Sequence, residues 1–221
     1  MKLARNTLFT ATVHLTLLVA GARMESSAAV TLFDNLSAGS PNGSFYVTNT
    51  QWTGQAFATT GTAFVLNQVS LRLWNQNGTT GGYQIQIWDS SGASGSPGAQ
   101  VGGAIHTGLA EDLGTNPGGL LNLTGLNISL NAGTSYYLIA LGTGLTDIED
   151  IFFPSPGTIA WDATDVNLAA TYDTGDSGAN WFGPYSQNLY MGISGESVPE
   201  VSSVALSALA IGASMCRRGR C

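Results

Sequence analysis

The sequence predicts an all-β fold, an antiparallel two-sheet β-sandwich of the jelly-roll type. Short runs in which apolar and polar side chains alternate recur along the chain, and clusters of Gly, Asn, Ser and Thr separate them at intervals of about 8–15 residues. Between the two ends of the chain, no stretch keeps the 3.6-residue period of an amphipathic helix. We therefore expect many short strands, with a signal helix before the sandwich and a short apolar helix after it.

The clearest strands are residues 69–74 (VSLRLW) and 83–88 (YQIQIW), which both alternate with a period of two. The connector at 75–82 contains an Asn-Gly and a Gly-Gly dipeptide, which are typical of tight turns. The two runs are therefore predicted to pair as an antiparallel hairpin. Trp88 is expected on the apolar face of this hairpin and Trp74 on the opposite face.

Further strands follow the same pattern. Residues 126–130 (LNISL) continue the alternation, and a turn at 131–133 leads into the apolar run 135–141 (SYYLIAL). Weaker candidates are 30–33, 44–47, 52–58, 104–106, 158–161, 168–172 and 189–194. Segments 89–100 and 176–185 are rich in turn-forming residues, so flexible surface loops are expected there.

Positive charge is concentrated at the two ends of the chain. Of seven Lys and Arg, three lie in the first 23 residues and three in the last five. Residues 30–197 carry twelve Asp and Glu against Arg72 alone, a net charge of −11 with His106 neutral. Because Lys and Arg resist translocation, this pattern is typical of a body exported across a membrane while both ends stay on the cytoplasmic face. An acidic surface also repels nucleic acid, so no such partner is expected.

The N-terminus has the organisation of a signal peptide. A short positive region (MKLAR) precedes an apolar run at 8–22, which is too short to span a membrane comfortably. Small residues allow cleavage after Ala22 or after Ala29, and the strand that starts at Val30 favours the second position. Residues 1–29 are therefore expected to direct export through the Sec machinery and to be removed by signal peptidase. A buried N-terminal helix is the alternative, because periodicity alone does not separate the two.

The C-terminal residues 196–221 form a second, different tag. In chain order it contains Val198, Pro199 and Glu200, an apolar run at 201–216, and the basic residues Arg217, Arg218 and Arg220. Sixteen helical residues cover about 24 Å, less than the ~30 Å hydrocarbon core of a bilayer. Four serines and a glycine weaken the run further. It is therefore a poor permanent anchor and a better transient sorting signal.

In this order of features the tail resembles the PEP-CTERM sorting domain of exported bacterial envelope proteins. That family usually has a second proline where this chain has Val201, but the Pro199-Glu200 pair is intact. The resemblance implies recognition by an exosortase, an integral-membrane transpeptidase-like enzyme, with release or transfer to the cell surface. A plain tail anchor is the alternative.

The body between the tags is expected to be one domain at residues 30–195. Both cysteines, Cys216 and Cys221, lie in the tail, so the body has no disulfide and must be held together by burial alone. Roughly 165 residues are enough for a single sizeable core.

Several stretches of this body also follow the order and spacing of a known module. They are 32–35 (LFDN), 51–57 (QWTGQAF), the pair of strands at 69–88, 95–98 (GSPG) and 130–137 (LNAGTSYY). Together they resemble the choice-of-anchor domains of exported bacterial proteins, in particular the R-type module. The resemblance implies a β-sandwich on the cell surface and no established reaction.

The side chains of the body restrict its chemistry. It has no Lys, no Cys, one His and one Arg, which excludes Schiff bases, cysteine nucleophiles and Cys-based zinc sites. His106 lies in a predicted strand, no Gly-x-Ser-x-Gly elbow accompanies it, and a structural role is favoured. No catalytic residue is therefore predicted. A glycoside hydrolase that uses two carboxylates is the remaining enzymatic alternative, but no pair is placed across a cleft by the sequence.

Acid-bearing loops are better suited to calcium, which takes six to eight oxygen ligands from carboxylates and carbonyls. The candidate ligands are Asp173 and Asp176 in one loop and Asp147, Glu149 and Asp150 in another. Neither loop has the spacing of an EF-hand, and a solvated acidic surface is the alternative. A structural calcium ion is thus the one cofactor considered.

Two tryptophans are candidates for contact with a glycan. Trp74 is expected on the open face of its strand and Trp181 in a loop, where amphipathic rings can stack on a sugar. The alternative is that these rings cover an edge or a second small core. The sequence as a whole predicts an exported, non-enzymatic protein of the bacterial surface or matrix, associated with exopolysaccharide. A glycan-binding module is the alternative from another class.

Overall fold

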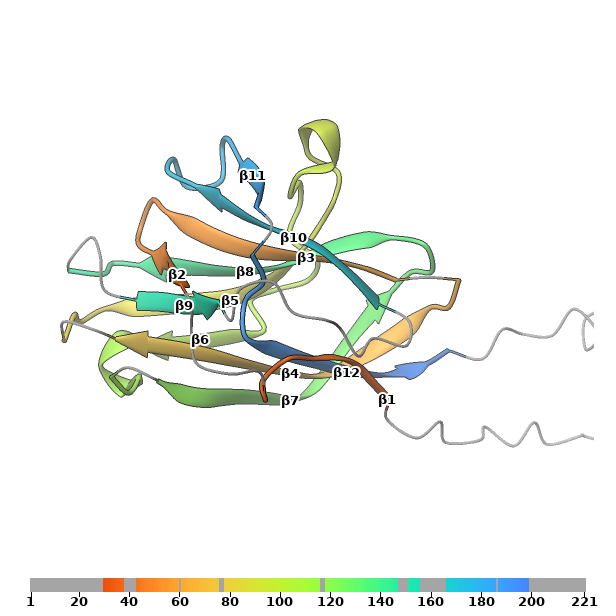
Figure 1. Ribbon diagram of the computed structural model, residues 1–221, viewed down its shortest axis with the longest axis horizontal. Coiled ribbons are helices and arrows are strands. Elements are labelled where there is room, and N and C mark those ends of the chain that lie inside the picture. Colours follow the sequence, from red (N-terminus) through yellow and green to blue (C-terminus); the bar gives the residue numbers. More distant parts are fainter. Residues whose placement is uncertain are drawn as a thin grey trace, which may run out of the picture.

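The computed structural model of the protein describes residues 30–37, 43–59, 61–75, 78–115, 118–146, 151–155, 166–185 and 187–198. Within these ranges, twelve β-strands form two six-stranded sheets with antiparallel pairing (Figure 1). The predicted all-β sandwich is confirmed. The helices expected in the signal segment and in the tail lie outside the described residues. None of the helices in the described part of the chain is long and apolar enough to cross a membrane.

The first sheet has the order β1-β12-β4-β9-β2, and β7 also pairs with β4. Its strands are β1 (Val30–Asp34), β2 (Gly43–Val47), β4 (Phe64–Asn75), β7 (Gly119–Leu130), β9 (Ile151–Ser155) and β12 (Met191–Ser197). Strand β4 is central, because β12 pairs along one of its edges and β7 along the other. Its last two residues, Trp74 and Asn75, pair with β9.

The second sheet has the order β11-β10-β3-β8-β5-β6. Its strands are β3 (Trp52–Thr59), β5 (Gly82–Asp89), β6 (His106–Leu109), β8 (Ser135–Thr143), β10 (Val166–Thr174) and β11 (Phe182–Tyr185). Two short 3-10 turns, η1 (Ala93–Gly95) and η2 (Ala110–Asp112), lie in the segments that flank β6.

The main core lies between the two sheets and follows the alternation of the strands. From β4 it takes Val69, Leu71 and Leu73, and from β5 it takes Tyr83, Ile85 and Ile87. Phe64 and Leu66 are buried in the same core although they have the opposite parity along β4. The pairing of β4 with β7 shifts register between Leu66 and Gln68, so a β-bulge reverses the alternation at this point.

A second apolar cluster covers the outer face of the second sheet. Ala56, Tyr137, Ile139 and Leu141 are buried there, and four partly buried aromatic side chains pack against them: Trp52, Trp88, Tyr172 and Trp181. The central strand β8 is therefore buried on both faces, which explains its nearly continuous apolar sequence.

The hairpin predicted from residues 69–88 is wrong. Strand β4 belongs to the first sheet, whereas β5 pairs with β8 and β6 in the second sheet. The connector therefore crosses from one sheet to the other. The period of two places side chains on faces but contains no information on the partner strand, and the six residues between β4 and β5 are enough to cross between the sheets.

The predicted position of Trp88 is also wrong. Tyr83, Ile85 and Ile87 point into the main core, and Trp88 follows Ile87 directly, so strand alternation places it on the outer face. There its ring lies 6.0 Å from that of Trp52 and 6.3 Å from that of Trp181, both in edge-on geometry.

Most other strand predictions match the structure, with shifted boundaries. The candidate at 104–106 corresponds to β6, which starts only at His106, and 189–194 corresponds to β12. The candidate at 158–161 lies outside the described residues. Strand β11 occupies part of a segment expected to be a loop, and β9 was not predicted at all. The loop at 89–100 contains η1 and is hydrogen-bonded rather than irregular throughout.

The two ends of the sandwich lie side by side. Strands β1 and β12 pair antiparallel, with Val30 opposite Gly195, so the first and the last strand meet at the same end of the molecule (Figure 1). Val30, the predicted start of the domain, is the first residue that the structure describes and lies in β1. Strand β12 continues to Ser197, two residues past the expected end of the domain at 195.

Candidate functional site

Three surface sites bring polar and aromatic side chains together in the described part of the chain. The first is a pocket between β6 and β7, the second is a cleft between the β5–β6 and β10–β11 loops, and the third is a shallow site beside β11. Each is considered in turn.

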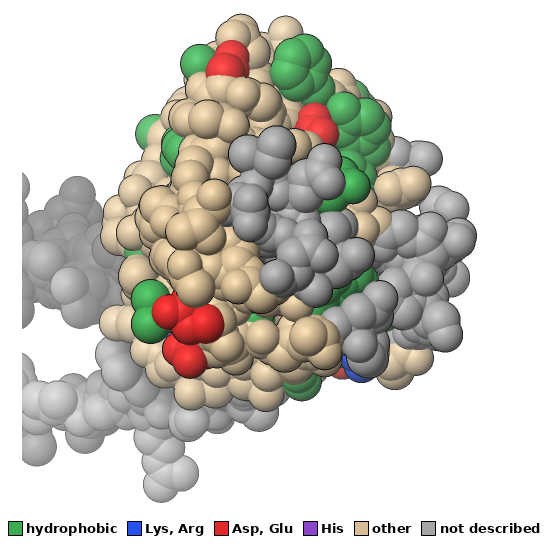
Figure 2. Space-filling model, turned by 90° about the vertical axis from the view of Figure 1, so that its left-hand side faces the viewer, with side chains coloured by type: hydrophobic (Ala, Val, Ile, Leu, Met, Phe, Trp, Pro, Cys, Tyr) green, Lys and Arg blue, Asp and Glu red, His purple; other side chains and the backbone are tan. Residues whose placement is uncertain are grey.

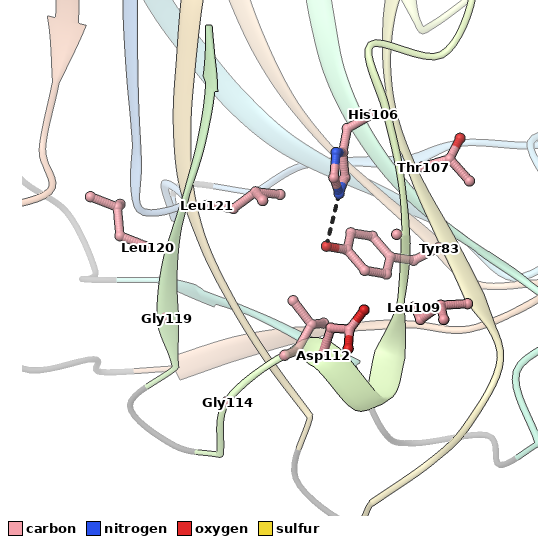
Figure 3. Close-up of a pocket in the computed structure, with 11 residues that line it drawn as sticks. Tyr83, His106, Thr107, Leu109, Asp112, Gly114, Gly119, Leu120 and Leu121 are labelled. Carbon is pink, nitrogen blue, oxygen red and sulfur yellow. Dashed lines mark hydrogen bonds between the residues drawn. The ribbon is translucent and has the colours of Figure 1, made fainter.

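The pocket between β6 and the start of β7 has a volume of about 310 Å³ and contains a Tyr–His pair (Figure 3). The hydroxyl of Tyr83 and Nε2 of His106 are 3.1 Å apart, and their rings are 5.5 Å apart. Asp112 and several leucines surround the pair, and Figure 3 shows His106 directed at the Tyr83 hydroxyl. Apolar neighbours therefore enclose one hydrogen-bonded polar pair.

Burial favours the uncharged form of both groups. It raises the pKa of the Tyr83 phenol to about 12, with a smaller contribution from the negative charge of Asp112. It lowers the pKa of the His106 imidazole below its usual value. The lining residues include the hydroxyl of Thr107 but no serine or cysteine. The pair is therefore placed to stabilise the edge of the sandwich or to contact a small uncharged molecule.

The cleft between the two loops has a volume of about 490 Å³ and contains Trp181. One wall is the β5–β6 loop, whose shape depends on Asp89. Its Oδ1 accepts hydrogen bonds from the amides of Ser91 (3.0 Å) and Ala99 (2.9 Å). The hydroxyl of Tyr137 donates to the carbonyl of Gly95 and ties the loop to the sheet. This wall is therefore ordered and presents small polar side chains.

The other wall of the cleft is the β10–β11 loop, which Asp176 organises. Its carboxylate accepts hydrogen bonds from the Thr174 hydroxyl (2.6 Å), the Asn180 amide (2.9 Å) and the Asn180 side chain (2.6 Å). These bonds, Thr174 first, lower the pKa of Asp176 to about 2. The carboxylate thus acts as a local cap that fixes the loop carrying Trp181.

The structure places the two predicted glycan tryptophans differently. Trp181 is half-buried, packs on Trp88 and has a buried Nε1 with no hydrogen-bond partner among the described residues. Trp74 is only 3% exposed, so the prediction of an exposed ring is wrong. Strand alternation places it on the face of β4 opposite Leu73, but that position is buried.

Two aromatic side chains that the sequence did not single out are exposed instead. Phe182 is 57% and Tyr185 is 38% exposed, and both line the shallow site beside β11 together with Asp173 and Gln51. Figure 2 shows a face of the molecule on which hydrophobic side chains gather near the top beside acidic side chains. The available signal was the aromatic spacing in residues 182–185, which the neighbouring turn residues obscured.

The predicted calcium ligands are only partly described. Asp173 accepts a hydrogen bond from the Tyr185 hydroxyl (3.0 Å), and Asp176 holds its own loop as above. Asp147, Glu149 and Asp150 lie outside the described residues. Within the described ranges, no group of three or more His, Cys, Asp or Glu side chains is close enough together to hold a metal ion. The calcium site stays a prediction.

Of the residues predicted to form the sorting signal, Val198 is the last residue of the chain that the structure describes. Val198 is exposed. Its amide donates to the Ala63 carbonyl at 2.9 Å, so the hydrogen bonding between this segment and the residue before β4 continues for one residue past β12. Pro199, Glu200, Arg217, Arg218 and Arg220 lie outside the described residues.

Comparison with known proteins gives no relative from which a function can be transferred. No model of a known protein family matches the chain, and a search of the curated proteins finds none that is similar to it.

Proposed function

We propose that this protein is an exported, non-enzymatic component of the bacterial cell surface or extracellular matrix. A signal peptide at residues 1–29 directs it to the Sec machinery, and signal peptidase removes that segment. The PEP-CTERM-like tail at 196–221 is recognised by an exosortase-type membrane enzyme. The body between the two tags is a choice-of-anchor-like sandwich that associates with exopolysaccharide.

The pairing of β1 with β12 is the structural observation that supports this proposal most. Val30, the first residue that the structure describes, follows the favoured cleavage position and lies in β1, and the last strand ends at Ser197, two residues before Pro199. Its first and last strands pair with each other, so removal of residues 1–29 and of the chain from Pro199 onward would leave both strands in the fold. A tag that contributed a strand could not be removed without exposing an unpaired edge.

Charge and cysteine usage give independent support. Residues 30–197 have a net charge of −11 and no cysteine, whereas the tail holds both cysteines and three of the seven basic residues. The positive charge at both ends suits tags that stay on the cytoplasmic side. A body without disulfides relies on its core, and the described core is large and continuous.

The proposal is tested with the Glu200→Gln variant in the native host. The variant keeps the size of the side chain but removes the charge of the Pro-Glu pair, so we expect the unprocessed chain to accumulate in the membrane fraction. Glu196→Gln is the matched control, since Glu196 belongs to β12 and accepts a hydrogen bond from Asn67 that glutamine also accepts. Equal processing of both variants and the wild type would contradict recognition of the Pro-Glu pair.

Binding of a glycan is the second candidate function. It is favoured by the gathering of aromatic side chains around the β10–β11 loop, where amphipathic rings lie partly in water. For a glycoside hydrolase, two carboxylates must face each other across a cleft. Among the described acids, Asp112 lines the pocket between β6 and β7, and Asp173 lines the shallow site beside β11. Asp173 and Asp176 accept hydrogen bonds from Tyr185, Thr174 and Asn180, which favours a structural role for them.

The calcium prediction is tested by thermal melting with and without a chelator. An ion that binds only the folded state raises the midpoint by ligand linkage, so EGTA should lower it if calcium is bound. Identical midpoints at saturating calcium and in EGTA would contradict the prediction.

A further inference from the structure

The shallow site beside β11 combines aromatic and polar groups on an ordered edge of the second sheet. Phe182 and Tyr185 come from β11, Asp173 and Thr174 from the end of β10, and Gln51 from the residue before β3. The site has a volume of about 260 Å³. Phe182 is 57% and Tyr185 is 38% exposed, so two large aromatic side chains contact water at one place.

Contacts within the protein fix the geometry of this site. The Tyr185 ring packs against the Phe45 ring at 5.7 Å, and its hydroxyl donates to Asp173 Oδ1 at 3.0 Å. Phe182 lies directly opposite Asp173 in the pairing of β10 with β11. The ring of Tyr185 and the carboxylate are therefore held in place before any ligand arrives, which lowers the entropic cost of binding.

Strand β11 approaches β10 too closely for a larger residue at its second position. Gly183 has a φ of +140°, and a Cβ there would lie 2.9 Å from the Thr171 carbonyl oxygen and 2.9 Å from Tyr172. Glycine is required at this point, and it allows Phe182 and Tyr185, three positions apart, to line the same site.

The chemistry of the site matches one sugar ring. The C–H face of a pyranose can lie on exposed aromatic rings, and its hydroxyl groups need acceptors at the rim. A carboxylate offers about four acceptor positions, of which Tyr185 takes one at Asp173. The amide of Gln51 can both donate and accept.

Charge selects between classes of polysaccharide. Residues 30–197 have a net charge of −11, and Arg72 is their one Lys or Arg. Arg72 lies on β4 in the other sheet, over the ring of Tyr190. No described Lys or Arg therefore lines the site to neutralise a uronic acid or a sulfate. An anionic polymer would be repelled over a distance of about 10 Å at moderate salt.

We propose that Phe182, Tyr185 and Asp173 bind an uncharged pyranose unit of a polysaccharide. Phe182 and Tyr185 stack on the ring, and Asp173 accepts hydrogen bonds from its hydroxyl groups. This inference rests on the proposed surface function, because it names the sugar class that the exposed body contacts.

The test measures binding of the full chain to a panel of neutral polysaccharides (cellulose, β-1,3-glucan, mannan and galactan) and to alginate as the anionic polymer. Affinity electrophoresis and titration calorimetry give the dissociation constants. We expect binding to at least one neutral polymer and none to alginate. Phe182→Ala and Tyr185→Ala should each weaken binding by about tenfold, as expected for the loss of one ring contact.

Two control variants keep the inference refutable. Leu120→Ala removes a side chain that is 48% exposed on β7 in the other sheet, so it tests whether any exposed apolar group has the same effect. Ser96→Ala changes the cleft that contains Trp181. Three results would each overturn the inference. The first is that none of the four neutral polymers binds, and the second is that Leu120→Ala weakens binding as much as the ring variants do. The third is that Ser96→Ala weakens binding while Phe182→Ala leaves it unchanged. None of these outcomes bears on removal of the tail, which Glu200→Gln tests separately.

Discussion

Asn75 ends β4, and its side chain connects three parts of the structure. It is 3% exposed. Its Nδ2 donates to the carbonyls of Thr79 and Ala110, both at 2.9 Å, and its Oδ1 accepts from the amides of Gly78 (3.0 Å) and Thr79 (3.1 Å). This one amide thus fixes the crossing from the first sheet to the second and attaches it to η2. We predict that Asn75→Ala destabilises the protein severely.

The magnitude follows from the bonds that are lost. Each of the four bonds contributes about 0.5–1.5 kcal/mol net, and a buried polar group without a partner costs about 1–3 kcal/mol. Thr79 and Ala110 are both buried, so water does not easily replace the lost partner. The free energy of unfolding should therefore fall by about 3–5 kcal/mol. Asn75→Asp keeps the acceptor but not the donors, and should be nearly as destabilising.

Urea unfolding followed by tryptophan fluorescence measures this change. With a slope of about 2 kcal/mol per molar urea, the midpoint should fall by about 2 M. Asn127→Ala is the control, because Asn127 is exposed on β7 and its replacement should change stability by less than about 0.5 kcal/mol. A midpoint for Asn75→Ala within about 0.5 M of the wild type, at an unchanged slope, would refute the role assigned to this side chain.

Three further predictions concern pH and packing. The pKa of Tyr83 is raised to about 12 in the folded state. The neutral phenol therefore contributes fully to the stability of the fold below pH 10, and this contribution is lost as the pH rises from 10 toward 12. The free energy of unfolding, measured with urea, should therefore fall less between pH 10 and 12 in Tyr83→Phe than in the wild type. An equal fall in both proteins would contradict this. The pKa of Asp176 is lowered from 3.8 to about 2 in the folded state. The ionised carboxylate therefore contributes to the stability of the fold above pH 4, and this contribution is lost as the pH falls toward 2. Asp176→Asn should show a smaller fall of the melting midpoint over this window, and an equal fall would show that the carboxylate does not stabilise the loop. A Cβ at Gly142 would lie 2.7 Å from the Thr48 carbonyl carbon, so Gly142→Ala should cost about 1–3 kcal/mol, and an unchanged urea midpoint would contradict the packing there.

Alternation of apolar and polar residues predicts which side chains share a face of a strand, and the sequence predicted these faces correctly for β4. Val69, Leu71 and Leu73 were assigned to one face and all are buried in the main core. The sequence did not predict which strands pair, because β4 and β5 each pair with strands that are distant in the chain, and a local pattern contains no information on such contacts. The bulge near Asn67, which reverses the alternation, depends on the same contacts.

The candidate sites were harder to predict, because exposure depends on which sheet face is covered. Trp74 was expected in water from its position on the strand, but it is only 3% exposed in the structure. Trp181 was correctly placed near a loop, where it caps the second apolar cluster. The exposed rings of Phe182 and Tyr185 lie in a segment whose Gly and Pro residues favoured a loop, and only the approach of β11 to β10 makes it a strand.

Export with loss of both tags is the central claim, and mapping the termini of the surface form by mass spectrometry tests it most directly. Cells of the native host are fractionated, and the intact mass of the mature chain is measured in each fraction. We predict a surface or extracellular form that begins at Val30 and lacks the basic end with Arg217, Arg218 and Arg220. A folded body that is found in the cytosol with residues 1–29 and the C-terminal tail still attached would contradict the claim.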